Sequence, residues 1–226
     1  MRWLLYGLAT VLILAIAGFA GLKVMQHTTG GGHYSFPSGS MMPTLHPGEH
    51  IVAWPAEGTP DRGDVILFKK PGAPGTFYVK RVIALPGDRI EMRDGGPVLN
   101  GETLSQTPEK PYAVHRDKHP RLETCKKEQG DGEHICRIDR WREELPGGRS
   151  YHVLNIGNFP PDVWPEATVP KGHVFVLGDN RDNSLDSRFP SIGFIPINSI
   201  TGKVAFRLIG KDANGTSAER SLSRIE

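Results

Sequence analysis

The chain has 226 residues, a formal net charge of +2, 27 glycines and 19 prolines. The small net charge argues against nucleic-acid binding, which needs a concentrated basic surface. Frequent glycine and proline beyond the N-terminus interrupt helical periodicity and are typical of short strands joined by turns. We therefore expect a mainly β protein, with about 195 residues after the first 30 or so available for one core, or for a core with an inserted unit.

Residues 4–24 form an apolar run with no charge before Lys23. Such a run is long enough to cross a bilayer as a helix, which needs about 20 residues. A cleaved signal peptide is the alternative, because residues 17–20 (AGFA) offer a small-residue cleavage site, but its apolar region is usually shorter. Arg2 precedes the run and no Lys or Arg follows Lys23 until Arg62. This asymmetry favours a retained anchor with its N-terminus in the cytoplasm and the body outside it.

Apolar, strand-like runs bounded by glycine or proline follow at residues 50–54, 64–69, 77–85, 174–177 and 202–209. The intervening stretch is rich in charge, proline and glycine and has only brief strand signals, such as residues 151–156. We interpret this stretch as an insertion between two halves of a β core. We predict an anchor at residues 1–26 and a linker at residues 27–33. The core consists of residues 34–91 and 172–226, and the inserted subdomain lies between its two pieces at residues 92–171.

The insertion contains both cysteines, Cys125 and Cys136. Outside the cytoplasm they would close a short loop as a disulfide, which stabilises a fold by roughly 2–3 kcal/mol in the chain-entropy model. A zinc site is the alternative, since His119 and His134 lie nearby, but zinc needs four ligands and this spacing matches none of its usual patterns. We favour the disulfide and expect no metal.

Residues 37–45 (PSGSMMPTL) place two serines just beyond the linker. Gly39 permits a tight turn between Ser38 and Ser40, and Pro43 restricts the residue before it to extended geometry. A serine at such a bend exposes its hydroxyl, although ordinary turn serines show the same pattern. A serine nucleophile also needs a base.

Lys80 is the candidate base, within the apolar run at residues 77–85 (FYVKRVIAL). In a strand it shares one mostly apolar face with Tyr78 and Val82, and the other face is also mostly apolar, so we expect burial on both sides. Burial lowers the pKa of a lysine from about 10.4 and favours the neutral amine, the form that can act as a base. The alternative is a buried stem whose amine reaches an acidic partner.

A dense polar segment, residues 178–188 (GDNRDNSLDSR), follows the strand predicted at residues 174–177. Counted from Asp179 or from Asp182, the twelfth residue is not the glutamate that an EF-hand calcium loop requires. Alternating acids and arginines indicate a network of ion pairs and turns instead. Such a network would orient a hydroxyl, such as that of Ser184, against the lysine amine.

Three segments in this order, residues 37–45, 78–88 and 178–188, resemble bacterial type I signal peptidase, also called leader peptidase. The resemblance covers nearly all of the presumed core. It implies a mainly β catalytic core with a β-rich insertion, preceded here by a single membrane helix where several members of the family have two. The insertion around the cysteines matches no motif of the family, and its role stays open.

The resemblance also implies a role for each matching residue. Ser40 would be the nucleophile and Lys80 the general base. The hydroxyl of Ser38 and the backbone N–H of Ser40 would stabilise the oxyanion, and Ser184 would hold the Lys80 amine. Ion pairing that supports the loop would come from Asp179, Asp186 and Arg188. Shallow pockets for small residues at positions −1 and −3 of a preprotein would be lined by Phe36, Pro37, Met41, Leu45, Tyr78 and Val79.

The activity implied by the resemblance is that of a serine endopeptidase that cleaves signal peptides from exported preproteins after a small residue (Ala-x-Ala type), without metal or cofactor. It would lie in the bacterial inner membrane with its catalytic domain on the periplasmic side. Its partners would be preprotein signal peptides, membrane lipid and, indirectly, the protein-export machinery. Two alternatives remain: a specialised Ser–Lys protease for a pilus or conjugation subunit, and a non-catalytic, membrane-anchored β domain that binds secreted chains.

Overall fold

The structure is a computed structural model that describes residues 6–7, 10–18, 32–70, 72–73, 75–115, 135–209 and 223–224. Residues 6–7 and 10–18 are helical. Within the described residues, no helix has the length and apolarity that crossing a membrane requires. Much of the predicted anchor falls outside these residues, and so do Cys125 and the side chain of Cys136, so the predicted disulfide stays a prediction.

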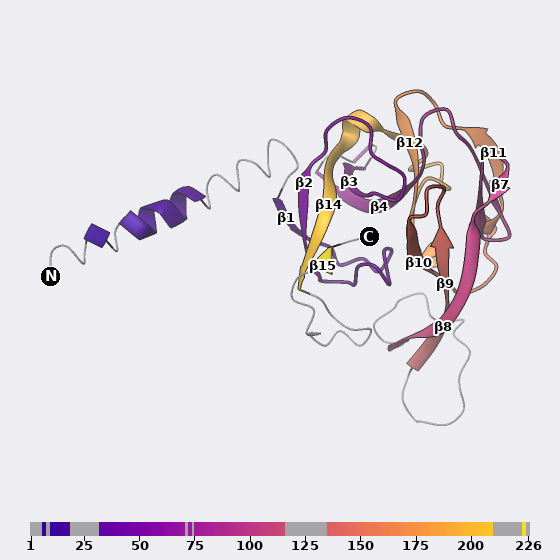
Figure 1. Cartoon of the computed structure of the whole chain (residues 1–226), viewed down its shortest axis with the longest axis horizontal. Helices are drawn as coiled ribbons and strands as arrows, with labels where there is room; N and C mark the ends of the chain where they lie inside the picture. Colours follow the sequence, from indigo (N-terminus) through magenta and orange to yellow (C-terminus); the bar gives the residue numbers. More distant parts are fainter. Residues whose placement is uncertain are drawn as a thin grey trace.

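The prediction of a mainly β fold is confirmed, because strands dominate the described residues (Figure 1). The largest sheet has the order β1-β2-β14-β3-β4-β12-β13, with β15 paired to β14. Its pairings are antiparallel. The strands of this sheet are β1 (Gly32–Ser35), β2 (His50–Pro55), β3 (Val65–Lys69), β4 (Phe77–Ala84), β12 (His173–Leu177), β13 (Ile195–Pro196), β14 (Ile200–Ile209) and β15 (Ser223–Arg224).

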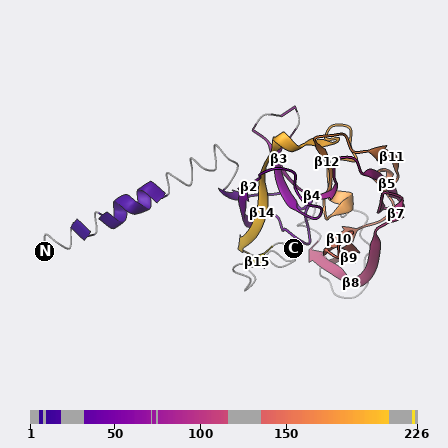
Figure 2. The ribbon, with the colours of Figure 1, turned by 45° about the horizontal axis from the view of Figure 1, so that its top comes forward.

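Two smaller antiparallel sheets lie between β4 and β12 in the sequence, with the orders β11-β5-β6-β7 and β10-β9-β8. In space they occupy the side of the body away from β1, β2 and β14 (Figures 1 and 2). Their strands are β5 (Arg89–Arg93), β6 (Gly96–Leu99), β7 (Glu102–Thr103), β8 (Ser105–His115), β9 (Ile135–Glu144), β10 (Ser150–Asn155) and β11 (Trp164–Thr168).

The five strand-like runs of the sequence correspond to β2, β3, β4, β12 and β14, and the brief signal at residues 151–156 corresponds to β10. The small sheets begin slightly earlier than residue 92, because β5 starts at Arg89. The sequence analysis gave little sign of the long strands β8 and β9, because their charged residues hide the alternation that marks a half-buried strand.

Buried side chains join the large sheet to the smaller ones. One hydrophobic cluster combines Ile83 of β4 and Phe175 of β12 with Met92, Tyr151 and Val153 of the smaller sheets. The core and the inserted region therefore share one interior. Strand β4 lies between β3 and β12, and from Val79 to Ala84 it is buried throughout, as its two apolar faces predict.

Candidate active site

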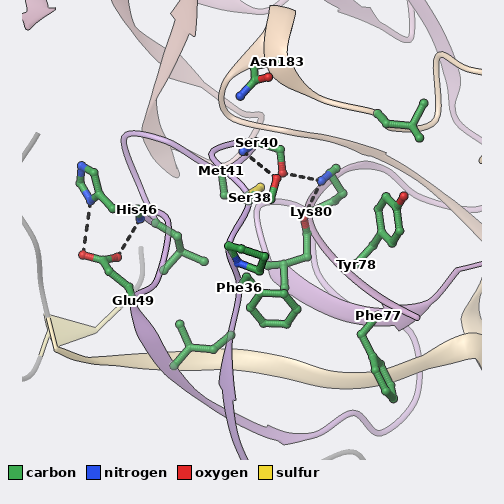
Figure 3. Close-up of a pocket in the computed structure, with 15 residues that line it drawn as sticks. Phe36, Ser38, Ser40, Met41, His46, Glu49, Phe77, Tyr78, Lys80 and Asn183 are labelled. Atoms are coloured by element: carbon green, nitrogen blue, oxygen red, sulfur yellow. Dashed lines mark hydrogen bonds and ion pairs between the residues drawn. The ribbon is translucent and has the colours of Figure 1, made fainter. Parts of the chain in front are cut away.

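Ser40 and Lys80 meet in the interior of the protein (Figure 3). Lys80 Nζ lies 2.8 Å from Ser40 Oγ, and the two residues are only 3% and 6% exposed. Lys80 comes from β4, whereas Ser40 lies in residues 36–49, which join β1 to β2 and are called the nucleophile loop below. Lys80 Nζ also donates to the Val79 carbonyl oxygen at 2.9 Å. A hydroxyl and an amine at this distance can exchange a proton directly.

Burial lowers the pKa of Lys80 from 10.5 to about 8, because removal from water disfavours the ammonium form. The negative charges of Asp186 and Asp179 raise the pKa and oppose this shift, whereas Arg188 lowers it further. With a pKa of about 8, about a tenth of the amines are neutral at pH 7, compared with about one in three thousand for a pKa of 10.5. The amine is therefore available as a base near neutral pH.

Ser38 lies beside the nucleophile on the same loop. The backbone N–H of Ser40 donates to Ser38 Oγ at 3.2 Å, so the hydroxyl and the amide are neighbours. Ser38 is exposed and lines the cavity beside the dyad. The two groups are close enough to donate to one acceptor oxygen that lies beside Ser40 Oγ.

Asn180 binds the backbone of the nucleophile loop through two hydrogen bonds. Its side-chain Nδ2 donates to the Gly39 carbonyl oxygen at 3.1 Å, and its backbone N–H donates to the Ser40 carbonyl oxygen at 3.1 Å. Asn180 belongs to the segment 178–188, far from Ser40 in the sequence. The sequence analysis assigned this segment to the lysine and missed its direct hold on the nucleophile, because no local pattern links two such distant segments.

Two bidentate ion pairs brace the same segment. Arg81 Nε and Nη2 donate to the two carboxylate oxygens of Asp179 at 2.9 and 2.8 Å. Arg188 Nε and Nη2 donate to those of Asp186 at 2.9 and 3.0 Å. Asp179 also accepts a hydrogen bond from the hydroxyl of Thr44 in the nucleophile loop. All four ionic side chains are buried, where a charge is tolerated only when it is paired in this way.

A third buried ion pair ties the segment to the inserted region. Arg181 Nη1 and Nη2 donate to Glu143 Oε2 and Oε1 at 3.0 and 2.7 Å. Glu143 lies in β9 and also accepts hydrogen bonds from the Tyr151 hydroxyl at 2.5 Å and from Gln106 Nε2 at 2.8 Å. The Arg81 guanidinium lies 4.0 Å from the centroid of the Tyr151 ring. Sequence reasoning missed Glu143, because a glutamate in a charged stretch resembles a solvated one.

Ser184 is buried near the dyad, but its hydroxyl has no hydrogen-bond partner among the described residues. The hydrogen bond to the Lys80 amine expected from the sequence is therefore not made in this structure. The packing around it is tight: a Cβ at Gly178 would lie 2.2 Å from Ser184 Oγ and 2.6 Å from the Ser40 carbonyl oxygen. Only glycine fits at position 178 while these two segments remain in contact.

A cavity of about 320 Å³ opens beside the dyad. Its wall contains Ser38, Ser40 and Lys80 together with all six residues predicted to bind substrate: Phe36, Pro37, Met41, Leu45, Tyr78 and Val79. The sequence analysis missed six further lining residues: His46, Glu49, Ile51, Phe77, Asn183 and Leu185. A small, mainly apolar hollow next to a nucleophile suits a short apolar side chain of a bound peptide.

Asp179 and Asp186 of the segment 178–188 are paired with Arg81 and Arg188, in line with the ion-pair network expected from the sequence. Among the residues that the structure describes, no group of three or more His, Cys, Asp or Glu side chains is arranged to hold a metal ion. The reactive groups that line the cavity are the hydroxyls of Ser38 and Ser40 and the amine of Lys80.

Comparison with known proteins identifies a family that this chain matches. Residues 3–209 match the family described as signal peptidase, peptidase S26. The chain is 31% identical over 194 residues to signal peptidase I of Pseudomonas aeruginosa, an alignment that covers 75% of this chain and 62% of that protein. It is 32% identical over 154 residues to signal peptidase I of Rickettsia prowazekii, with 65% and 51% covered. The chain thus spans between about half and just under two thirds of the length of these relatives.

Among solved structures, the crystal structure of a signal peptidase I from Enterococcus faecalis is similar in sequence at 28% identity. The match covers 66% of this chain and 98% of that one, with a TM-score of 0.36.

Proposed function

Because the chain belongs to the signal peptidase family, peptidase S26, we propose that it is a serine endopeptidase that removes signal peptides from exported preproteins. The observation that carries the proposal is the buried 2.8 Å contact between Lys80 Nζ and Ser40 Oγ. The similarity to proteins named signal peptidase I supports the reaction class. The apolar cavity beside the dyad supports a peptide substrate with a small side chain at the scissile bond.

The proposed reaction begins with neutral Lys80. Its nitrogen takes the proton of Ser40 Oγ as that oxygen bonds to the scissile carbonyl carbon and forms a tetrahedral oxyanion. The ammonium then gives this proton to the leaving nitrogen as the C–N bond breaks, so the mature protein departs and an ester on Ser40 remains. Lys80 next takes a proton from water, whose oxygen attacks the ester, and Ser40 leaves with the proton restored.

The oxyanion receives hydrogen bonds from the Ser38 hydroxyl and the Ser40 backbone N–H. A donor of this kind typically lowers the barrier by about 3–4 kcal/mol, because it is aimed at charge that develops only in the transition state. In the proposed role of Ser184, its hydroxyl rotates toward the Lys80 amine. The lack of another partner for this buried hydroxyl among the described residues leaves it available for that contact.

The lining of the cavity supports the proposed specificity for small residues at −1 and −3. In an extended peptide, alternate side chains lie on the same face, so both positions enter the hollow together. Met41, Leu45 and Val79 are buried parts of its wall, which leaves little room for branched or long side chains. We propose cleavage of the Ala-x-Ala type on this basis.

We also propose that the protein is anchored in the bacterial inner membrane by residues 1–26, with the catalytic body on the periplasmic side. The support is the apolar run at residues 4–24 and the positive charge that precedes it. Anchoring would bring the cavity to signal peptides that are themselves held in the membrane, and would make lipid and the export machinery its neighbours.

The test is cleavage of a preprotein by the full chain in detergent or lipid. Ser40→Ala and Lys80→Ala should each reduce the rate at least 10³-fold, because removal of one member of a nucleophile–base pair disables the whole unit. A matched control is Lys69→Ala, an exposed lysine at the end of the adjacent strand β3, which should cleave at close to the wild-type rate. Near-normal cleavage by either dyad variant would refute the assignment.

A further inference from the structure

His46 is part of the cavity wall and is held from two sides. Its Nδ1 lies 3.3 Å from Glu49 Oε1, and its backbone N–H donates to Glu49 Oε2 at 2.9 Å. Its Nε2 contacts the hydroxyl of Tyr112. The two ring nitrogens therefore contact a carboxylate on one side and a phenolic hydroxyl on the other. With both nitrogens engaged, the orientation of the imidazole ring is fixed.

Tyr112 reaches this wall from the inserted region, where it lies in β8, 66 residues beyond His46. The pairing of β8 with β9 shifts register between Glu109 and Tyr112. Irregularities of this kind often re-aim a side chain next to a functional site. The tyrosine ring also packs against the imidazole, with the ring centroids 6.1 Å apart. The position of Tyr112 in β8 thus brings its side chain into contact with His46.

A second contact from the same sheet reaches the nucleophile loop. Met42, two residues after Ser40, is 2% exposed and packs in a cluster with Val114 of β8, Ile138 of β9 and Leu154 of β10. The sheet β10-β9-β8 therefore supports the loop at two points, one of them polar and on the cavity wall. No motif in the sequence of this region indicates such a role.

We propose that Tyr112 is a positioning residue that sets the selectivity of the cavity for the side chain at −3, acting through His46. In Figure 3, His46 and Lys80 lie on opposite sides of Ser40. We therefore place the −3 side chain on the His46 side of the cavity, away from the dyad. A ring fixed at both nitrogens is a rigid wall that excludes branched side chains. A ring released on one side can turn and admit them. This inference rests on the proposed function in one respect, that the cavity takes the residues before the scissile bond.

The experiment compares two signal peptides that differ only in alanine or valine at −3, with the full chain in detergent. The wild type should prefer alanine. Tyr112→Phe removes one hydroxyl and keeps the ring, and should reduce this preference, measured as the ratio of kcat/KM values, about 3- to 10-fold, the worth of one net hydrogen bond. The kcat for the alanine peptide should change less than twofold. If Tyr112 had only a structural role, Tyr112→Phe would lower kcat/KM equally for the two peptides.

A double variant tests whether the effect passes through His46. In a His46→Leu background, adding Tyr112→Phe should change the alanine-to-valine ratio no further, because the bond is already absent. An equal additional change would overturn the proposal.

Binding separates this proposal from the proposed function. The two peptides are titrated against Ser40→Ala and against Ser40→Ala combined with Tyr112→Phe, where no turnover is required. A reduced alanine preference in the double variant supports the inference. Binding with an unchanged preference overturns the inference alone. Absence of binding by either peptide overturns it together with the proposed function.

Discussion

At the scale of single residues, the main feature of the site is that burial lowers the pKa of Lys80. Water is excluded from the amine, and this desolvation outweighs the opposing charges of Asp186 and Asp179, so that the pKa falls to about 8. The nearby aspartates do not neutralise this effect, because each is already paired with its own arginine, Arg188 or Arg81. The arrangement keeps the pKa of a lysine low beside two carboxylates.

The pH dependence of cleavage should report this pKa. Because only the neutral amine acts as the base, kcat/KM should rise with pH through a midpoint of about 8 and then level off. Asp186→Asn removes a charge that raises the pKa, so its midpoint should be lower. The measurement is a pH–rate profile under kcat/KM conditions. A wild-type midpoint close to 10.5 would contradict the desolvation of Lys80.

At the scale of structural elements, the segment 178–188 connects three parts of the chain through hydrogen bonds and ion pairs. It holds the nucleophile loop through Asn180, strand β4 through Asp179, and strand β9 through Arg181. The contacts of Asp179 and Arg181 are buried ion pairs, so the loss of either partner would leave an uncompensated charge. The inserted region is in this way part of the support of the active site.

Glu143 provides a direct test of that support. Glu143→Ala leaves the buried Arg181 guanidinium without its carboxylate and should lower the free energy of unfolding by about 3–5 kcal/mol. Its neighbour Glu144 is exposed, so Glu144→Ala should change stability by less than about 0.5 kcal/mol. Urea unfolding of both variants, followed by tryptophan fluorescence, makes the comparison. Equal stability of the two would show that the pair contributes nothing.

At the scale of the whole molecule, the proposed anchor and the β body would have separate tasks. The dyad, the cavity and the ion pairs described above all lie between residues 36 and 188. None of these contacts involves the helical residues near the N-terminus. The proposed anchor would therefore set where the enzyme works, and the body would set what it cleaves.

Removal of residues 1–26 should separate these tasks. The truncated protein should no longer co-sediment with membranes, yet should cleave a short, soluble signal-peptide substrate with a kcat within about tenfold of that of the full chain, because the catalytic contacts are unchanged. Flotation with vesicles and a peptide assay measure the two properties. Persistent membrane binding would show that the anchor lies elsewhere. A larger loss of peptide cleavage would show that the segment contributes to the site.

The sequence by itself determined the mainly β class, the five strands of the core and the candidate pair Ser40 and Lys80, and its resemblance to signal peptidases added the six cavity residues. The strands and the candidate pair are local features, because each depends on an alternating pattern or a turn residue that one stretch of chain carries in full. The resemblance depends on short motifs, which are local in the same sense. The apolar surroundings of Lys80 were readable for the same reason, because they are its own strand neighbours.

Only the tertiary structure decided how these pieces meet. The hold of Asn180 on the nucleophile loop, the pairing of Arg181 with Glu143, and the contact of Tyr112 with His46 each join residues that are 38 to 141 positions apart. The burial of a charged residue such as Glu143 depends on a partner that the local sequence does not contain. Periodicity records which face of a strand turns inward, but the identity of what it meets there is set by the packing of distant strands.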